Sequence, residues 1–155
     1  MATYKVIGKG ETKKFVDDKA YEDSIRYICN PQKASHIGGY GLQNISNAAK
    51  EMEDTAIAFH KNKGKRVRHS VLSFDQKENI TPEQAYEYGR QISAVTNRYQ
   101  TVFSVHTNTD HVHIHFVMNQ ISFVDGQRYY GTKKDYYEVL KGISSVTHLP
   151  TIPLK

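Results

Sequence analysis

The sequence has one cysteine, four prolines and no tryptophan, and its apolar residues never run for more than a few positions. The lone Cys29 can form neither an internal disulfide nor a cysteine-rich zinc site, and it suits a reducing compartment. A membrane-spanning helix needs roughly 20 consecutive apolar residues, and no basic-then-apolar signal segment follows Met1. The sequence therefore predicts a cytoplasmic protein that does not associate with a membrane.

The length of 155 residues is that of one compact domain, and we find no internal repeat or low-complexity segment. Lys and Arg number 21 against 16 Asp and Glu, for a net charge of +5, which favours an anionic partner without identifying it. Histidine (8) and tyrosine (11) are plentiful, and both side chains do chemistry and stack on bases. A monomer is the default expectation.

Hydrophobic periodicity and turn signals predict helices and strands without strict alternation. Strands are expected at residues 3–7, 67–74, 101–106 and 111–121, with hairpin turns at 107–110 and 125–126. Helices are expected at 17–30, begun by Asp17 and Asp18, at 44–61, at 81–97 with a capping box, and at 133–145. Segment 32–43 is interpreted as a loop able to act as a lid, and 147–155 as a tail. Because hairpins pair antiparallel, the predicted class is α+β, with helices packed on a mainly antiparallel sheet.

Three histidines alternate with apolar residues between positions 111 and 116. Alternate side chains of a strand share a face, so His111, His113 and His115 are expected on one face and the apolar residues in the core. With residues 107–110 as the turn, His106 is expected opposite His111 and diagonal to His113. Three imidazoles then converge on one point, with Asp110 beside them.

Neutral imidazoles bind divalent transition metals, and a three-histidine site leaves coordination positions open for a substrate oxygen. The spacing therefore predicts a catalytic metal site rather than a closed structural one. By ligand softness, three imidazoles suit Mn, Co, Ni or Zn better than Mg. His69, on the expected strand 67–74, either reaches the same face or is a buried, hydrogen-bonded histidine.

The series His106-x3-Asp110-His111-x-His113-x-His115-x3-Asn119 resembles the third motif of the relaxases, the Mob-type mobilisation nucleases of the HUH endonuclease superfamily. The segment 27–33, Tyr-Ile-Cys-Asn-Pro-Gln-Lys, is similar to the family's first motif, which carries the catalytic tyrosine. Segment 69–74 and the helix start at 81–83 are similar to its middle motif. The resemblance covers most of the chain from about residue 21 to 119. It implies that residues 1–155 form a single nuclease domain, the N-terminal part of a longer protein.

The resemblance implies site- and strand-specific nicking and rejoining of DNA at an origin of transfer, for conjugative transfer. Tyr27 would attack the scissile phosphate and form a 5′-phosphotyrosyl link, assisted by a divalent metal that is Mn or Mg in function. Asp110 is the first candidate for a base or histidine orienter, and His111 the second. The family's metal ligands match His106, His113 and His115. Single-stranded or hairpin origin DNA is the implied substrate, with accessory mobilisation and coupling proteins as further partners. By periodicity alone, Tyr27 is one of eleven tyrosines.

Basic residues occur near the expected site, where phosphate contact becomes a better interpretation than a solvated surface. The residues predicted to contact DNA are Lys33, Lys65, Arg66, Arg68, Arg128, Lys133 and Lys134.

Three alternatives stay open at this point. A rolling-circle replication initiator or transposase of the same superfamily would use a tyrosine after the histidine motif, Tyr136 or Tyr137. A non-catalytic DNA-binding module would hold a structural metal or none. A metallohydrolase of small phosphate esters would turn over without any tyrosine.

Overall fold

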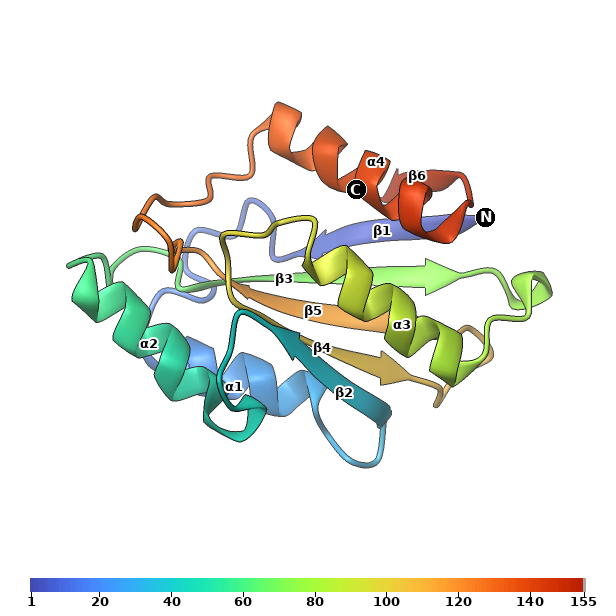
Figure 1. Cartoon of the computed structure of the whole chain (residues 1–155), viewed down its shortest axis with the longest axis horizontal. Coiled ribbons are helices and arrows are strands. Elements are labelled where there is room, and N and C mark those ends of the chain that lie inside the picture. The colour runs from blue at the N-terminus through green and yellow to red at the C-terminus, as the bar shows by residue number, and fades with distance from the viewer. Residues whose placement is uncertain (155) are drawn as a thin grey trace.

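One six-stranded sheet organises the protein (Figure 1), whose computed structural model describes residues 1–154. The strands are β1 (Ala2–Ile7), β2 (Ala34–Tyr40), β3 (Val67–Phe74), β4 (Thr101–His106), β5 (His113–Asn119) and β6 (Thr151–Leu154). Their order is β2-β4-β5-β3-β1-β6, and every neighbouring pair is antiparallel except β1 and β6. Within these residues the α-helices are α1 (Lys19–Ile28), α2 (Ala48–Ala58), α3 (Pro82–Ser93) and α4 (Lys133–Thr147). The α+β class predicted from the sequence is confirmed.

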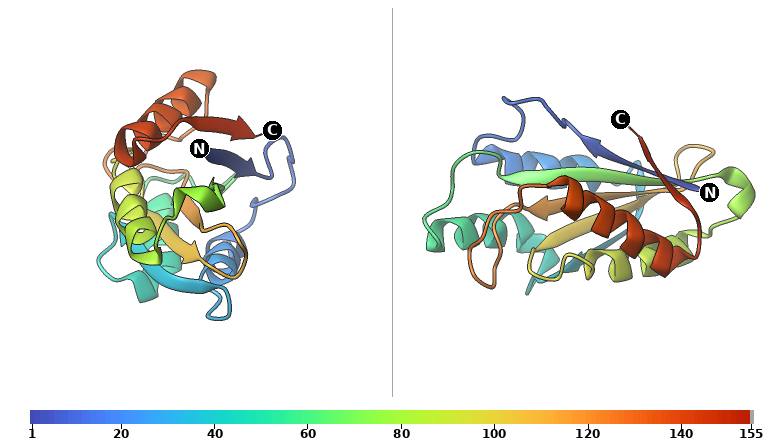
Figure 2. Two further views of the ribbon diagram at one scale, coloured as in Figure 1. Left: turned by 90° about the vertical axis from the view of Figure 1, so that its right-hand side faces the viewer. Right: turned by 90° about the horizontal axis from the view of Figure 1, so that it is seen from above.

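Helices cover both faces of the sheet, so the central strands are buried on both sides. Figure 2 shows α1 on one side and α3 and α4 on the other. The apolar cluster under α1 and α2 includes Val67, Val102 and Val117, whereas the larger cluster under α3 and α4 includes Phe103 and Ile114. The even-numbered residues of β4 and the odd-numbered residues of β3 and β5 therefore face α1. Polar side chains at these positions therefore lie on the same face of the sheet and can contact one another.

The prediction of a loop at 32–43 is wrong for the central part of that segment, because residues 34–40 form the edge strand β2. Gly41, just after the strand, has a φ of +72° and is a turn glycine. Gly38 serves close packing rather than a turn: a Cβ on Gly38 would lie 2.3 Å from Cζ of Phe103, and one on Gly89 of α3 would lie 2.4 Å from Cδ2 of the same ring. Glycine inside a strand often marks such a close approach. The Phe103 ring thus fits between β2 and α3, and no lid is present at this place.

Gly38→Ala is expected to lower the free energy of unfolding by about 2 kcal/mol, because overpacking a filled core costs about 1–3 kcal/mol. Denaturant unfolding measures the change. The cost should shrink when the same substitution is made in a Phe103→Leu background, since the smaller side chain leaves room for the methyl group. Equal costs in the two backgrounds would show that the ring is not the cause.

Several boundaries also differ from the predictions. The tail 147–155 contains β6, which pairs with β1, and strand β5 begins at His113 instead of His111. Asp18 occupies the N-cap position of α1 without a side-chain capping bond, because its carboxylate pairs with Arg66. The 125–126 turn leads only to an isolated bridge, Ile121 with Arg128, and not to a full hairpin. The capping box of α3 is confirmed. No helix within residues 1–154 is long and apolar enough to span a bilayer.

Candidate active site

Three histidine side chains meet on the α1 face of the sheet, at the end where β4 stops and β5 starts. His106 pairs directly opposite His113, and His115 follows on the same face of β5. Each of the three offers a ring nitrogen within 4.8 Å of the others, and the His106 and His115 ring centroids are 4.2 Å apart. The predicted convergence is confirmed, but the predicted pairing of His106 with His111 is wrong by two residues because the turn is longer, 107–112. The three imidazoles can hold one divalent ion.

Backbone carbonyls fix two of these rings. His106 donates from Nε2 to the carbonyl oxygen of Ile28 (2.7 Å), and His113 donates from Nδ1 to that of His111 (2.9 Å). A neutral imidazole that donates from one nitrogen keeps its lone pair on the other. Metal-binding histidines almost always have such an outer hydrogen bond. The donor set therefore fits a divalent transition metal.

The third ring, His115, is held by another histidine. His69 of β3 is 5% exposed, and its Nε2 lies 2.9 Å from Nδ1 of His115. If Nε2 of His115 carries the lone pair for the metal, Nδ1–H donates to His69. Sequence reasoning left His69 open between two roles, and the structure shows both: it is buried, and it reaches the site. Only the register of β3 against β5, which the sequence does not reveal, decides this.

His69→Ala is expected to weaken divalent-metal affinity about 10–100-fold, the usual effect of removing an outer partner of a ligand. His69→Gln should retain most of the affinity, because its side-chain carbonyl can accept the same hydrogen bond. Calorimetric titration with Mn²⁺ measures both, alongside circular dichroism to confirm that each variant folds. Unchanged affinity in the Ala variant would show that His69 does not support His115.

Burial lowers the pKa of three histidines at this site. Desolvation lowers the pKa of His115 to about 2, helped by the nearby His106 and His69, and lowers the pKa of His69 to about 4, helped by Lys14 and His106. The pKa of His106 is also lowered, mainly by desolvation. At neutral pH His69, His106 and His115 are therefore uncharged, and the neutral imidazole is the form that binds a metal.

Tyr27 lies beside the histidines at the last turn of α1. Its ring centroid is 5.9 Å from that of His69 and 6.4 Å from that of His115, and the side chain is 57% exposed. The bond from His106 to the carbonyl of Ile28, the next residue, ties this end of α1 to the sheet. Lys33 places its ammonium 5.4 Å from the centroid of the Tyr27 ring. An accessible phenol, a cation and three metal-competent imidazoles thus share one site.

Asp110 lies in the turn, as predicted, and His111 lies in the same 107–112 loop instead of on the strand. The Asp110 side chain is exposed and has no hydrogen bond or ion pair with any residue among 1–154. His111 donates from Nδ1 to the carbonyl of Phe74 (3.1 Å), while its own carbonyl holds His113. His111 precedes β5 and is not one of the three histidines whose ring nitrogens meet, although it lines a pocket together with His113. Its backbone carbonyl orients His113.

The alternative tyrosines lie elsewhere. Tyr136 and Tyr137 belong to α4, which packs on the opposite face of the sheet from the three histidines. The Tyr136 hydroxyl donates to the carbonyl of Tyr4 (3.4 Å), on β1. The sheet separates both rings from the histidine site.

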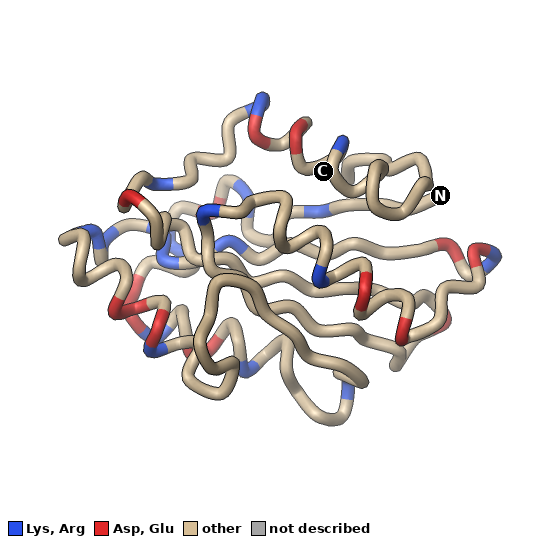
Figure 3. Tube along the Cα trace, in the orientation of Figure 1, with Lys and Arg blue, Asp and Glu red and all other residues tan. Residues whose placement is uncertain are grey.

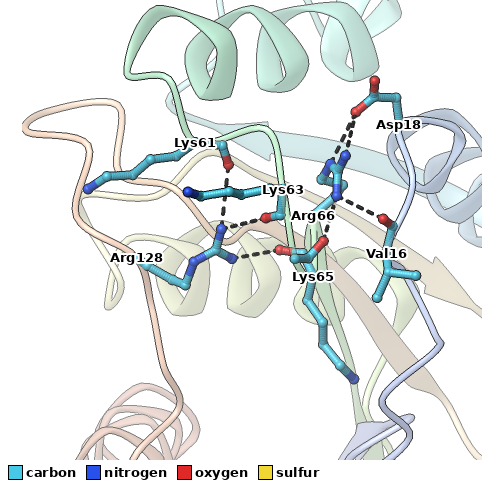
Figure 4. A network of polar contacts seen from close by, with 8 residues as sticks. Val16, Asp18, Lys61, Lys63, Lys65, Arg66 and Arg128 are labelled. Atoms are coloured by element: carbon cyan, nitrogen blue, oxygen red, sulfur yellow. Dashed lines mark hydrogen bonds and ion pairs between the residues drawn. The ribbon is translucent and has the colours of Figure 1, made fainter.

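Two of the arginines predicted to contact DNA are engaged with the protein (Figure 4). Arg66, 9% exposed, donates to the carbonyls of Val16 (2.8 Å) and Gly64 (2.7 Å) and pairs with Asp18 (3.0 Å). The Arg128 guanidinium donates to three carbonyls of the basic turn, those of Lys61, Lys63 and Lys65. Both guanidinium groups use their N–H donors to hold the protein's own loops. These are the donors that would otherwise bind a phosphate.

The other basic residues are spread widely, as Figure 3 shows for all Lys and Arg. Arg68 faces the α4 side of the sheet, where it lies 5.3 Å from the centroid of the Tyr129 ring. Lys133 and Lys134 are the first residues of α4. Figure 1 shows that α4 starts near the end of the sheet where β3 starts, away from the end where β4 stops and the histidines lie. The Lys65 ammonium donates to the carbonyl of Gly8 (3.1 Å). Of the seven predicted residues, Lys33 is the one that the structure brings to Tyr27.

Comparison with known proteins now bears on this geometry. The sequence model of the relaxase family described as MobA/VirD2-like, nuclease domain, matches residues 27–147. The chain belongs to this family. The matched region of the relaxase domain begins at Tyr27 and includes all three histidines.

Individual relatives agree. The relaxase domain is 26% identical over 132 residues to the group II intron-interrupted relaxase LtrB of Lactococcus lactis subsp. cremoris, covering 66% of this chain and 23% of that protein. It is 27% identical over 113 residues to a protein rlx of Staphylococcus aureus, covering 71% of this chain and 34% of that protein. A second rlx from the same species is 26% identical over 124 residues, with 79% and 38% covered. The relaxase domain thus spans about a quarter to two fifths of the length of these curated relatives.

Proposed function

We propose that this domain nicks and rejoins one strand of DNA at an origin of transfer, through Tyr27 and a 5′-phosphotyrosyl intermediate. The observation that carries the proposal is the meeting of an exposed tyrosine with three metal-competent histidines on one sheet face. Membership of the relaxase family supports the same chemistry. Single-stranded or hairpin origin DNA is the proposed substrate, and conjugative transfer the proposed role.

The proposed metal ligands are His106, His113 and His115. A divalent ion, Mn²⁺ or Mg²⁺ in function, supplies Lewis-acid polarisation of the scissile phosphate when bound. The carbonyl of Ile28 orients His106, the carbonyl of His111 orients His113, and His69 orients His115. These outer bonds fix the orientation of the three rings before substrate arrives.

The protein's own residues perform the nucleophilic step. A phenol has an ordinary pKa near 10, so a base or cation must assist its deprotonation at neutral pH. Lys33, beside the ring, stabilises the developing phenolate, and exposed Asp110 is the candidate acceptor of the proton. Attack by the Tyr27 oxygen forms the tyrosine–phosphate bond and releases a free 3′-hydroxyl. Because the bond energy is conserved in the ester, a 3′-hydroxyl can reverse the reaction and reseal the strand.

A denaturing gel tests the proposal. The domain is incubated with Mn²⁺ and with single strands, labelled at the 3′ end, that span the candidate origin of the element that encodes it. A labelled band at the mass of protein plus DNA fragment is expected, and a chelator should remove it. DNA binding without any covalent band on the correct origin would instead support a non-catalytic module.

A further inference from the structure

A pocket of about 490 Å³ opens directly beside Tyr27, between α1 and residues 8–18, which we call the N-terminal strap. Tyr27, His69 and His115 form its inner wall, and Phe15, Val16 and Ala20 provide apolar surface. Its volume is within the range of small-ligand sites, about 300–1,000 Å³. The strap lies outside residues 27–147, the region matched by the family.

Side chains of both charges line this pocket. Lys13 and Lys14 are exposed cations on the strap, whereas Asp17 and Asp23 provide carboxylates near the start of α1. Lysines attract backbone phosphates, and carboxylates repel phosphates but accept hydrogen bonds from base N–H groups. An aromatic ring, apolar surface, cations and acceptors together match the parts of one nucleotide.

The strap is held in an unfavourable conformation at Phe15. This residue has φ of +63°, a left-handed value that is a genuine outlier for a bulky side chain. The backbone N–H of Arg66 donates to the Phe15 carbonyl (2.7 Å), and the Arg66 guanidinium binds the carbonyl of Val16 and the carboxylate of Asp18, which both follow Phe15 (Figure 4). Strained residues that their surroundings hold in place cluster at ligand sites. Arg66 thus fixes the backbone of the strap at Phe15, a residue that lines the pocket.

We propose that this pocket receives one unpaired nucleotide of single-stranded DNA next to the scissile phosphate. The base of this nucleotide stacks on the Phe15 ring and donates to the carboxylates of Asp17 or Asp23. The phosphates on either side of the nucleotide contact Lys13 and Lys14. The inference rests on the proposed function, because the pocket shares a wall with Tyr27 and His115. It assigns phosphate contact to two lysines that the sequence pattern did not single out.

Fluorescence anisotropy with a labelled mixed-sequence single-stranded 20-mer tests the pocket, measured at several salt concentrations. Phe15→Leu should weaken binding about tenfold and leave the salt dependence unchanged, because base stacking is lost and no charge is removed. Lys13→Ala/Lys14→Ala should reduce the slope of log affinity against log salt by about 1.4, since each phosphate contact on a single strand contributes about 0.7. Lys50→Ala/Lys141→Ala, which removes the same charge from α2 and α4, should leave the slope unchanged.

Two comparisons separate a binding role of Phe15 from a packing role, since its side chain also contacts the core under α1 and α2. Phe15→Tyr keeps an aromatic ring and should bind like the wild type. Affinity for a duplex of the same sequence should not respond to Phe15→Leu, because paired bases cannot enter the pocket. Wild-type affinity of Phe15→Leu for the single strand, or equal losses for Leu and Tyr, would overturn the proposal.

The two proposals can fail separately. A covalent adduct in the wild type, together with unchanged DNA affinity in Phe15→Leu, would retain the proposed function and reject the pocket. Absence of an adduct on the correct origin, together with a tenfold loss in Phe15→Leu, would reject the nicking reaction and support the pocket as a nucleotide site.

Discussion

Replacing Tyr27 by Phe is expected to eliminate the covalent protein–DNA band completely, while DNA binding stays within about twofold of the wild type. The substitution removes one oxygen, the atom that would become bonded to phosphorus, and keeps the ring that lies against His69 and His115. Without the attacking oxygen no covalent bond to phosphorus can form, so the loss of adduct should exceed that caused by any other single substitution. The denaturing gel measures the adduct, and anisotropy measures binding.

Tyr137→Phe is the matched control, because it also removes one hydroxyl from a half-exposed helical tyrosine, 54% exposed. It lies on α4, across the sheet from the histidines, and should form adduct at the wild-type rate. Loss of the band in Tyr137→Phe but not in Tyr27→Phe would assign the nucleophile to α4 and favour the replication-initiator or transposase alternative. A band that survives both substitutions would point to another nucleophile.

The histidine site could be predicted because its information is local. Alternation along β5 places His113 and His115 on one face whatever the partner strand is. The predicted pairing of His106 was wrong because it depends on the length of the turn. A turn that extends to residue 112 shifts the partner of His106 from His111 to His113. The convergence of His106, His113 and His115 survives this shift, because His113 and His115 lie on the same face of β5 in either register. His111 lies in the turn before the strand.

Long-range packing accounts for the failed predictions. The glycines of 38–41 predict a loop, because the ring of Phe103, against which Gly38 packs, comes more than sixty residues later. Strand β6 pairs with β1 at the other end of the chain. For His69, pairing between β3 and β5 decides which histidine it meets.

The arginines show a different limit. A basic run such as 61–68 has the same composition whether it faces solvent, DNA or the protein's own carbonyl oxygens. In the structure, Arg66 and Arg128 bind the protein's own carbonyl oxygens, and Arg68 lies on the opposite face of the sheet from His69. Charge counting favours an anionic partner but does not indicate which residues would contact it.

Removal of any one of the three site histidines is expected to abolish useful metal affinity. Loss of an outer partner already costs about 10–100-fold, so His106→Ala, His113→Ala or His115→Ala should weaken Mn²⁺ binding by at least about 100-fold. Adduct formation should fall with it at fixed Mn²⁺ concentration. His60→Asn is the matched control: His60 is exposed, and its φ of +58° is one that asparagine tolerates.

Thermal unfolding provides the decisive readout, because it separates metal binding from catalysis. Metal that binds only the folded state stabilises it by RT ln(1 + [M]/Kd), about 2.7 kcal/mol at one hundred times Kd. Mn²⁺ should therefore raise the Tm of the wild type and of His60→Asn, and a chelator should reverse the rise. It should leave the Tm of His113→Ala unchanged. The chelated protein should stay folded, since β4 and β5 are held by a complete sheet and two apolar clusters rather than by the ion. A Tm that rises equally in His113→Ala and the wild type would place the metal elsewhere and leave the three histidines without the role proposed for them.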